Sequence, residues 1–202
     1  MNKTIILLYY TFFVVINAAE ILEKGVSKEN KKEIVDAHNE LRLKLVNGQV
    51  PNQPRATDMK EMCWDEQLAK EAQRIANKLI FKHALVDDDR WISIGQNLAQ
   101  RGSSVDVKNP SWESIVNDWF NEVKLYKYGP MYIHGTGHYT QVVWARTTQV
   151  GCGYVRFIDR KKKLPYRRLY VCNYGPGGNI DGVPPYKTGR CGCVGLCKTK
   201  CS

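Results

Sequence analysis

The stretch Gly137-His138-Tyr139-Thr140-Gln141-Val142-Val143-Trp144 decides how this sequence is interpreted. It combines an imidazole, hydroxyl and amide groups, a valine pair and an indole, and it continues to the glycine-flanked cysteine of Gly151-Cys152-Gly153-Tyr154. The stretch is too polar for a plain core strand and too apolar for a solvated loop. We therefore predict that it forms the wall of a functional site.

A second stretch, Tyr170-Val171-Cys172-Asn173-Tyr174-Gly175-Pro176-Gly177-Gly178-Asn179, also carries a β-prone run with a cysteine into a turn of glycine and proline. We predict two strands, at about 150–158 and 168–174, joined by a solvated basic turn at 159–165. Cys152 and Cys172 are natural disulfide partners on these adjacent strands. By the chain-entropy estimate, closing a loop of this size contributes ~3 kcal/mol.

These two motifs carry a resemblance. The sequence resembles the CAP superfamily of cysteine-rich secretory proteins, antigen 5 and plant pathogenesis-related proteins, and within it the arthropod antigen 5 venom and salivary allergens. The resemblance extends from about Lys28 to Tyr186. We expect an α+β fold, a three-layer α-β-α sandwich with a small, mainly antiparallel sheet, followed by a short disulfide-rich C-terminal tail.

The first nineteen residues have the pattern of a secretory signal peptide. Lys3 precedes an apolar segment at 5–16, and the small residues Ala18 and Ala19 mark the expected cleavage site. Twelve apolar residues are too few for a transmembrane helix, which needs about 20. We predict a secreted, extracellular protein with its family domain at 20–187 and a tail at 188–202, and the resemblance implies venom or saliva.

The formal charge of +10 indicates which kinds of partner this protein can bind outside the cell. Removing the signal peptide takes away Lys3 and leaves +9. A basic secreted protein favours anionic membrane surfaces, heparan-like glycans and acidic partners. Nucleic acid is not expected as a partner, because the chain is exported and has no basic helix or aromatic RNA-binding motif.

Helical spacing of apolar residues predicts a first helix at 27–47 and a second at 65–81. A third begins at the Asn109-Pro110 pair and carries an apolar stripe whose edge places Glu122 where it can point into a cavity. Between the second and third helices, the residues at 91–99 suggest a short strand that leads into a polar bend.

Seven cysteines in an exported chain indicate disulfides, and the odd number leaves one thiol over. Cys63 stands alone in an otherwise cysteine-free half of the chain and is the candidate for the free thiol. The tail cysteines at 191, 193, 197 and 201 allow three connectivities. The resemblance suggests the pairs Cys191–Cys197 and Cys193–Cys201.

In the resembling family, two histidines and two carboxylates line a central cleft. The matching positions are His83, Gln96, Glu122 and His138, so an amide replaces one carboxylate. His83, Glu122 and His138 form a candidate Zn²⁺ set, and Gln96 and Gln141 are expected as polar cleft residues. A satisfied buried polar network is the competing interpretation. No residue is assigned a catalytic role, and no cofactor is required.

Three functions compete. The first is a non-enzymatic binding protein that takes a small lipid, sterol or fatty-acid-like, or engages a host protein. The resemblance implies ligands in helix grooves or under an aromatic loop, and the candidate loop residues are Tyr126, Tyr128, Met131 and Tyr132. The second is a metal- or histidine-dependent protease, which Gln96 weakens because an amide cannot act as a base. The third is a glycan-binding or immune-recognition module that uses the basic surface around 160–163.

Overall fold

The computed structural model describes residues 19–86, 88–131, 133–189, 192–199 and 201. Almost all of the expected signal peptide, together with Tyr132 and Cys191, lies outside these residues. Within them, every helix is too short or too polar to cross a membrane.

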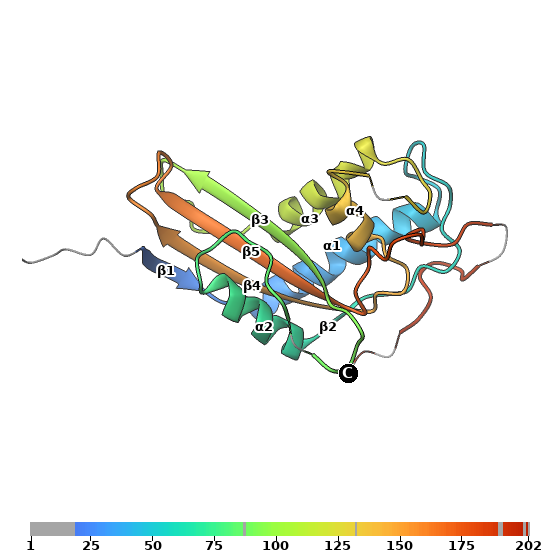
Figure 1. Ribbon diagram of the computed structural model, residues 1–202, viewed down its shortest axis with the longest axis horizontal. Helices are drawn as coiled ribbons and strands as arrows, with labels where there is room; N and C mark the ends of the chain where they lie inside the picture. Colours follow the sequence, from blue (N-terminus) through green and yellow to red (C-terminus); the bar gives the residue numbers. More distant parts are fainter. Residues whose placement is uncertain (1–18, 87, 132, 190–191, 200, 202) are drawn as a thin grey trace, which may run out of the picture.

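The helices and strands follow one another along the chain as shown in Figure 1. In order they are β1 (Glu20–Lys24), α1 (Lys28–Val46), β2 (Cys63–Trp64), α2 (Glu66–Ala76), β3 (Gly95–Ser103), α3 (Trp112–Asn121), the 3₁₀ helix η1 (Glu122–Leu125), α4 (Gly137–Val142), β4 (Gln149–Ile158) and β5 (Tyr166–Gly175).

The sheet has the strand order β1-β4-β5-β3, and all neighbours in this order are antiparallel. The short β2 adds a parallel pairing to β4 over two residues. The predicted hairpin is confirmed as β4 and β5, with Cys152 directly opposite Cys172 and a disulfide between them.

Helices cover both faces of the sheet, so the expected three-layer α-β-α sandwich is confirmed (Figure 1). On one face, α1, α3 and α4 pack against alternate residues of the hairpin, among them Tyr154, Tyr170 and Tyr174. On the other face, Ala72, Ile75 and Ala76 of α2 pack against a separate cluster that consists of Leu98, Val155, Phe157, Leu169 and Val171. The alternation along each strand divides the apolar residues between two cores.

Two glycines let α2 lie directly on β4. A Cβ atom at Gly151 would be 2.2 Å from the backbone nitrogen of Ala69, and one at Gly153 would be 2.3 Å from that of Gln73. The Gln73 side chain then bonds both the N–H and the carbonyl of Tyr154, at 3.0 and 2.9 Å. The glycine-flanked cysteine of the sequence motif is therefore a helix-packing feature.

The second predicted helix ends earlier than its apolar pattern indicated. α2 stops at Ala76, and Leu79 has a φ of 58°, in the left-handed region that a helix cannot pass through. The first helix, by contrast, is confirmed with Ser27 as its N-cap, whose hydroxyl accepts from the N–H of Asn30 at 3.2 Å.

Two further boundaries differ from the sequence prediction. β3 begins at Gly95, so Gln96 and Asn97 lie in a nine-residue strand and not in a polar bend, because β5 provides backbone partners along its whole length. The third helix begins at Trp112 with Ser111 in the cap position, after the Asn109-Pro110 pair.

The cysteine pairings suggested by the resemblance are wrong for the tail. Cys63, expected to be free, is bonded to Cys201, and Cys193 is bonded to Cys197. The pairs Cys191–Cys197 and Cys193–Cys201 are thereby excluded. The tail runs along the segment before β2, where Cys193 N–H donates to the Thr57 carbonyl and Cys197 N–H to that of Met59, at 3.3 and 2.8 Å. This docking brings Cys201 to Cys63.

Candidate functional site

A cleft of about 390 Å³ is lined by residues from several separated parts of the chain. The four positions that the resemblance assigns to a cleft, His83, Gln96, Glu122 and His138, all line this one. The other lining residues are Asn97, His134, Gly135, Gly137 and Asn179. The loop after α2, strand β3, η1 and the start of α4 therefore meet at one end of the sheet.

Glu122 and His138 form a tight pair. Nδ1 of His138 donates to Oε1 of Glu122 at 2.6 Å, and the side chains of His138 and Glu122 are only 31% and 23% exposed. The second carboxylate oxygen accepts the backbone N–H groups of His138 and Tyr139, at 3.0 and 3.1 Å. Glu122 thus caps the N-terminus of α4, where the Thr136 side chain makes no cap bond.

His83 is held by the residue that replaces a carboxylate. Oε1 of Gln96 accepts from Nδ1 of His83 at 3.0 Å and from the Ala84 N–H at 3.1 Å. Its amide nitrogen donates to Oδ1 of the fully buried Asn173 at 2.9 Å. Because both ends of the amide are engaged, Gln96 has one orientation, and Nδ1 of His83 is the protonated nitrogen.

This arrangement suits a divalent metal in part. Each imidazole gives its Nδ1 proton to an acceptor, which leaves Nε2 of His83 and of His138 with a free lone pair. Both carboxylate oxygens of Glu122 accept hydrogen bonds from N–H donors. Glu122 therefore orients His138 and does not act as the third Zn²⁺ ligand that was expected from the sequence. Across the part of the chain that the structure describes, no group of three or more His, Cys, Asp or Glu is arranged to hold a metal.

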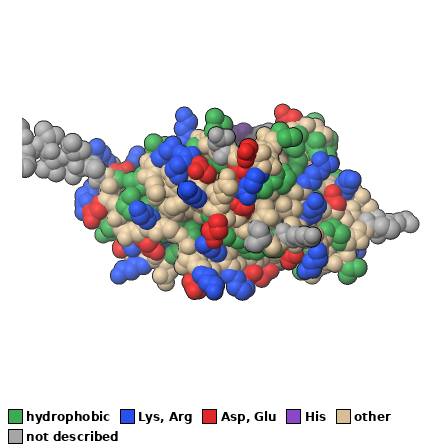
Figure 2. Space-filling view, turned by 90° about the horizontal axis from the view of Figure 1, so that it is seen from below, with side chains coloured by type: hydrophobic (Ala, Val, Ile, Leu, Met, Phe, Trp, Pro, Cys, Tyr) green, Lys and Arg blue, Asp and Glu red, His purple; other side chains and the backbone are tan. Residues whose placement is uncertain are grey.

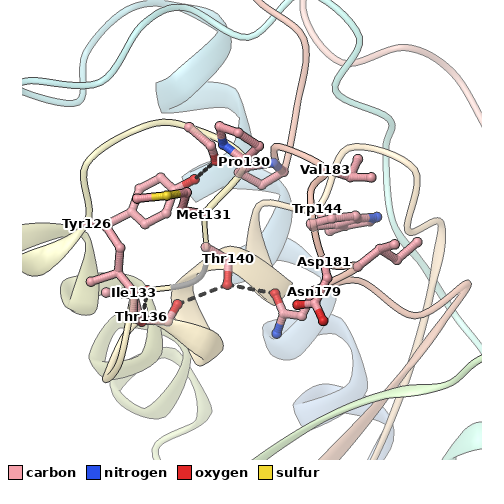
Figure 3. Close-up of a pocket in the computed structure, with 13 residues that line it drawn as sticks. Tyr126, Pro130, Met131, Ile133, Thr136, Thr140, Trp144, Asn179, Asp181 and Val183 are labelled. Carbon is pink, nitrogen blue, oxygen red and sulfur yellow. Dashed lines mark hydrogen bonds between the residues drawn. The ribbon is translucent and has the colours of Figure 1, made fainter.

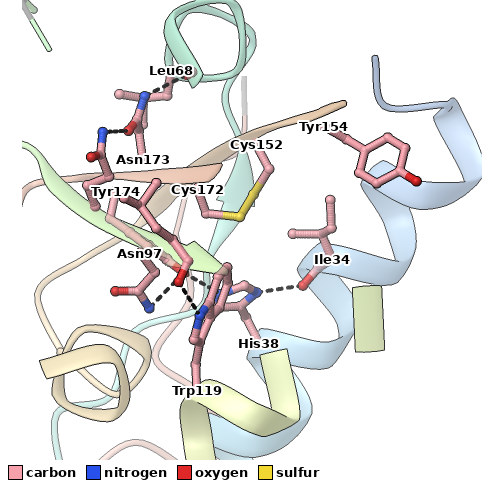
Figure 4. The surroundings of a disulfide bond; sticks show 12 residues. Ile34, His38, Leu68, Asn97, Trp119, Cys152, Tyr154, Cys172, Asn173 and Tyr174 are labelled. Carbon is pink, nitrogen blue, oxygen red and sulfur yellow. Dashed lines mark hydrogen bonds between the residues drawn. A yellow bond between two sulfur atoms is a disulfide. The ribbon is translucent and has the colours of Figure 1, made fainter. Parts of the chain in front are cut away.

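The His138 ring is positioned from behind as well. It stacks on Trp119 of α3, with ring centroids 6.1 Å apart, and its carbonyl accepts from Asn97 Nδ2 at 3.1 Å. Asn97 also reaches the hydroxyl of Tyr174, which bonds Nε2 of the buried His38 at 3.0 Å (Figure 4). Burial lowers the pKa of His38 to about 4, so it remains neutral as part of this network.

Gln141 does not line the cleft as expected. Its side chain is 1% exposed, and its Oε1 accepts from the Gly178 N–H at 2.8 Å. A Cβ atom at Gly95 would lie 1.9 Å from the same oxygen, so only glycine fits there. Gln141 joins the two sequence motifs beneath the site.

Arg42 of α1 fixes the segment that follows α4. It is fully buried and donates to the carbonyls of Val142 and Trp144 at 3.0 and 2.9 Å, and to those of Lys60, Ala145 and Thr147. Burial lowers the pKa of its guanidinium to about 9. A charged group surrounded by carbonyls makes this segment rigid.

The tyrosines at the start of the candidate ligand loop pack against the rest of the protein. Tyr126 is 6% exposed, while the ring of Tyr128 packs at a tilt against that of Tyr186, with a centroid distance of 4.9 Å. Figure 3 shows Tyr126 and Met131 facing Trp144 across a small pocket. Its volume of about 30 Å³ has room for roughly two water molecules and not for a lipid.

A larger cavity lies on the other side of Tyr126, between the end of α1 and η1. It has a volume of about 500 Å³, and its walls include the apolar side chains of Val50, Phe120 and Val123. Three lysines also line it: Lys44, Lys124 and Lys127. Oε1 of Gln53, another lining residue, is buried and has no hydrogen-bond partner within the described residues.

Sequence reasoning missed two features of these sites. His134 lines the cleft as a third imidazole, and its position four residues before His138 was the available signal. The three lysines of the larger cavity come from the end of α1 and from the segment after α3, and no local spacing links them. Only the packing of α1 against α3 brings them together.

The chain is similar in sequence to a known protein family and to several individual proteins. A family model described as the cysteine-rich secretory protein family, CAP, matches residues 35–174. Venom allergen 5 of Tityus serrulatus is 39% identical over 82% of this chain, which spans 42% of that relative's length. Salivary antigen-5 of Triatoma infestans is 37% identical, with 85% of this chain and 77% of the relative covered.

Solved structures share the fold. BmVAL-1 superposes with a TM-score of 0.73 at 27% identity, with coverage of 90% of this chain and 99% of BmVAL-1. The crystal structure of NaASP2 with Zn²⁺ has a TM-score of 0.68 at 29% identity and covers 82% of this chain and 88% of NaASP2.

Proposed function

This chain belongs to the cysteine-rich secretory protein family, and from that membership we propose that it is a secreted, non-enzymatic antigen 5-like protein that sequesters an anionic lipid. The names of its relatives, venom allergen 5 and salivary antigen-5, support delivery in venom or saliva. The observation that carries the proposal is the cavity between α1 and η1.

The size and lining of this cavity fit a lipid. Its volume of about 500 Å³ falls within the range of roughly 300–1,000 Å³ that small-molecule sites occupy. Phe120 and Tyr126 are 8% and 6% exposed, so its walls are part of the core and are already formed. Each methylene buried there would contribute about 0.8 kcal/mol to binding.

The lysines favour a fatty-acid-like ligand over a sterol. Lys44, Lys124 and Lys127 are exposed and have no ion pair within the described residues, so they can meet a carboxylate at the rim. A sterol offers a hydroxyl but no charge, and would leave the lysines without a function in binding.

The test is a titration of delipidated protein with a fluorescent fatty acid and with labelled cholesterol. We expect saturable fatty-acid binding that weakens at high salt, because charge pairs at the rim are screened. Cholesterol binding with no fatty-acid binding would overturn the choice of ligand, and binding of neither would overturn the function.

We propose in addition that His83 and His138 present Nε2 atoms to a divalent metal. The free lone pairs support this, as does the crystal structure of NaASP2 with Zn²⁺. Bound there, the metal would supply a Lewis acid with open positions for water or a carboxylate. Glu122 and Gln96 would hold the rings in place.

A protease function has less support. None of the described residues that line the cleft is a Ser, Thr or Cys, so among them the imidazoles have no neighbouring nucleophile to activate. The carboxylate of Glu122 is used as a helix cap, and Gln96 cannot accept a proton as a base. Peptide hydrolysis that is lost in a His138→Ala variant would reverse this conclusion.

A further inference from the structure

Most of the positive charge of this protein comes from one hairpin. Residues 156–168 contain seven Lys and Arg and one acidic residue, Asp159, so thirteen residues contribute +6 of the formal +10. These residues are the end of β4, the turn and the start of β5. The like charges repel one another and destabilise the folded state unless a bound anion neutralises them.

The tip of the hairpin is a structured turn. Asp159 N–H donates to the Pro165 carbonyl at 2.8 Å, while Oδ1 of Asp159 accepts from the Lys161 N–H at 3.1 Å. Lys161, Lys162 and Lys163 are all exposed, and they form no ion pair with another described residue. The backbone that carries these three lysines is therefore ordered before a ligand binds, which lowers the entropy cost of binding.

Behind the tip, three arginines stand directly opposite one another across the sheet. Arg156 of β4 pairs with Arg168 of β5, which pairs with Arg101 of β3. Direct partners project from the same face, and like charges in this position repel. Arg156 contacts Glu23 and Asp106, and Arg101 contacts Asp118. Among the described residues, Arg168 has no ion pair and donates to the Asn109 carbonyl at 3.4 Å.

From these observations we propose that the hairpin end of the sheet, defined by Lys161, Lys162, Lys163, Arg168 and Arg101, binds a sulfated glycosaminoglycan. Guanidinium groups form paired hydrogen bonds with planar and tetrahedral anions, and the lysines add point charges. Neighbouring strands lie about 4.8 Å apart, so the row matches a polymer with closely spaced anionic groups.

An anionic membrane fits this surface less well. Membrane binding combines basic residues with apolar side chains that enter the acyl boundary. The apolar residue of the turn, Leu164, is 42% exposed and folds back over β3, where its Cβ would be 3.1 Å from a Cβ added at Gly102. Part of its side chain therefore packs on the sheet, and a single half-exposed leucine is a weak anchor.

The surface is separate from the cleft and the lipid cavity. In Figure 1 the turn between β4 and β5 lies at the opposite end of the sheet from α4. Figure 2 shows several Lys and Arg side chains, drawn in blue, at the same end of the molecule. Binding to a glycan at the hairpin end leaves both other sites open, so the protein can be retained on a cell surface and still take its ligand.

The test uses a matched pair of triple variants of the full chain. The first changes Lys161, Lys162 and Lys163 to Gln, and the control changes Lys28, Lys70 and Lys78 to Gln. All six lysines are exposed and each variant lowers the formal charge from +10 to +7. Affinity for a heparin oligosaccharide is measured by calorimetry at physiological salt, alongside vesicles of phosphatidylcholine and phosphatidylserine.

We expect about a tenfold loss of heparin affinity in the tip variant and little change in the control, because three exposed charge pairs are lost in one variant alone. Arg168→Gln should weaken binding further. Equal losses in both variants would show attraction by net charge and would overturn the site. Vesicle binding that depends on the tip lysines, with heparin affinity unchanged, would assign the surface to membranes instead.

Discussion

Oε2 of Glu122 accepts the backbone N–H of His138 at 3.0 Å while Oε1 of the same carboxylate accepts the Nδ1 proton of the His138 ring at 2.6 Å. One side chain from η1 therefore fixes both the start of α4 and the direction of the imidazole. The polar network and the metal site, which compete as interpretations of the sequence, share this carboxylate.

Replacing Glu122 with Ala should lower the free energy of unfolding by about 2 kcal/mol, since it removes a helix cap and a charge-assisted hydrogen bond. Glu122→Gln keeps an acceptor for the α4 N–H groups and should lose less. Urea unfolding with a constant m-value would measure both changes. Equal stability of the Ala variant and the parent would show that the capping geometry contributes nothing.

Stability should depend on pH through His38. Burial lowers its pKa from 6.5 to about 4. The unfolded chain therefore binds a proton that the folded chain refuses between these two values. The free energy of unfolding is therefore highest, as far as His38 is concerned, above the unfolded pKa of 6.5. It falls as the pH drops from 6.5 toward 4, by about 3 kcal/mol in total.

A His38→Gln variant isolates this effect. It should be less stable near neutral pH, but its free energy of unfolding should change less between about pH 6.5 and pH 4. The Asp88 carboxyl does not interfere in this window, because hydrogen bonds from Arg90 lower its pKa from 3.8 and its stability is lost in stronger acid. Parallel pH profiles for variant and parent would contradict the assignment.

Zn²⁺ binding, if His83 and His138 provide it, should fall at least tenfold when either is changed to Ala, because one imidazole is a weak site alone. Calorimetry at neutral pH measures the loss. His134→Ala tests the third imidazole of the cleft and should reduce affinity less than the other two. Unchanged heats in the His138→Ala protein would remove the metal from this site.

By the chain-entropy estimate, the Cys63–Cys201 disulfide should contribute about 5 kcal/mol, since it closes a long loop in the unfolded chain. A Cys63→Ser, Cys201→Ser double variant should unfold at lower urea, whereas opening Cys193–Cys197, which closes a four-residue separation, should cost less. Peptide mapping under non-reducing conditions checks the pairing directly, and a Cys193–Cys201 peptide would contradict it.

Local sequence patterns predicted much of the fold. The Ser27 cap and the 3.6-residue period predicted α1, and two β-prone runs with facing cysteines predicted the β4–β5 hairpin and its disulfide. These features depend on residues close in sequence or directly paired. α2 was predicted too long because Leu79 continues the apolar period, although its backbone leaves the helix.

The features that could not be predicted from the sequence depend on packing between distant parts of the chain. β3 is a strand because β5 pairs with it from Gly95 to Ser103, which overrides the turn preference of Gly-Gln-Asn. Cys63 lies 138 residues from Cys201 and has no local signal for that partner. His83, Glu122 and His138 were placed together by resemblance, and their hydrogen bonds to Gln96 and to α4 are visible only in three dimensions.

Lipid binding should be lost when the cavity is filled. Val123 is partly buried and lines the cavity, so Val123→Trp places an indole in the space that a lipid chain would occupy. A triple change of Lys44, Lys124 and Lys127 to Gln should instead weaken a fatty acid several-fold and abolish the salt dependence of its binding. The control is the Lys28, Lys70 and Lys78 triple variant, which removes equal charge elsewhere.

The two variants separate the apolar and the charged parts of the proposal. If the ligand is a fatty acid held as described, the Trp variant loses affinity for every chain, while the lysine variant still binds the corresponding fatty alcohol as well as the parent does. Fluorescence displacement measures both, and circular dichroism verifies that the Trp variant is folded. Full affinity in a folded Val123→Trp protein would place the lipid elsewhere, because Val123 lines the cavity and the larger indole would displace a chain that lies against it.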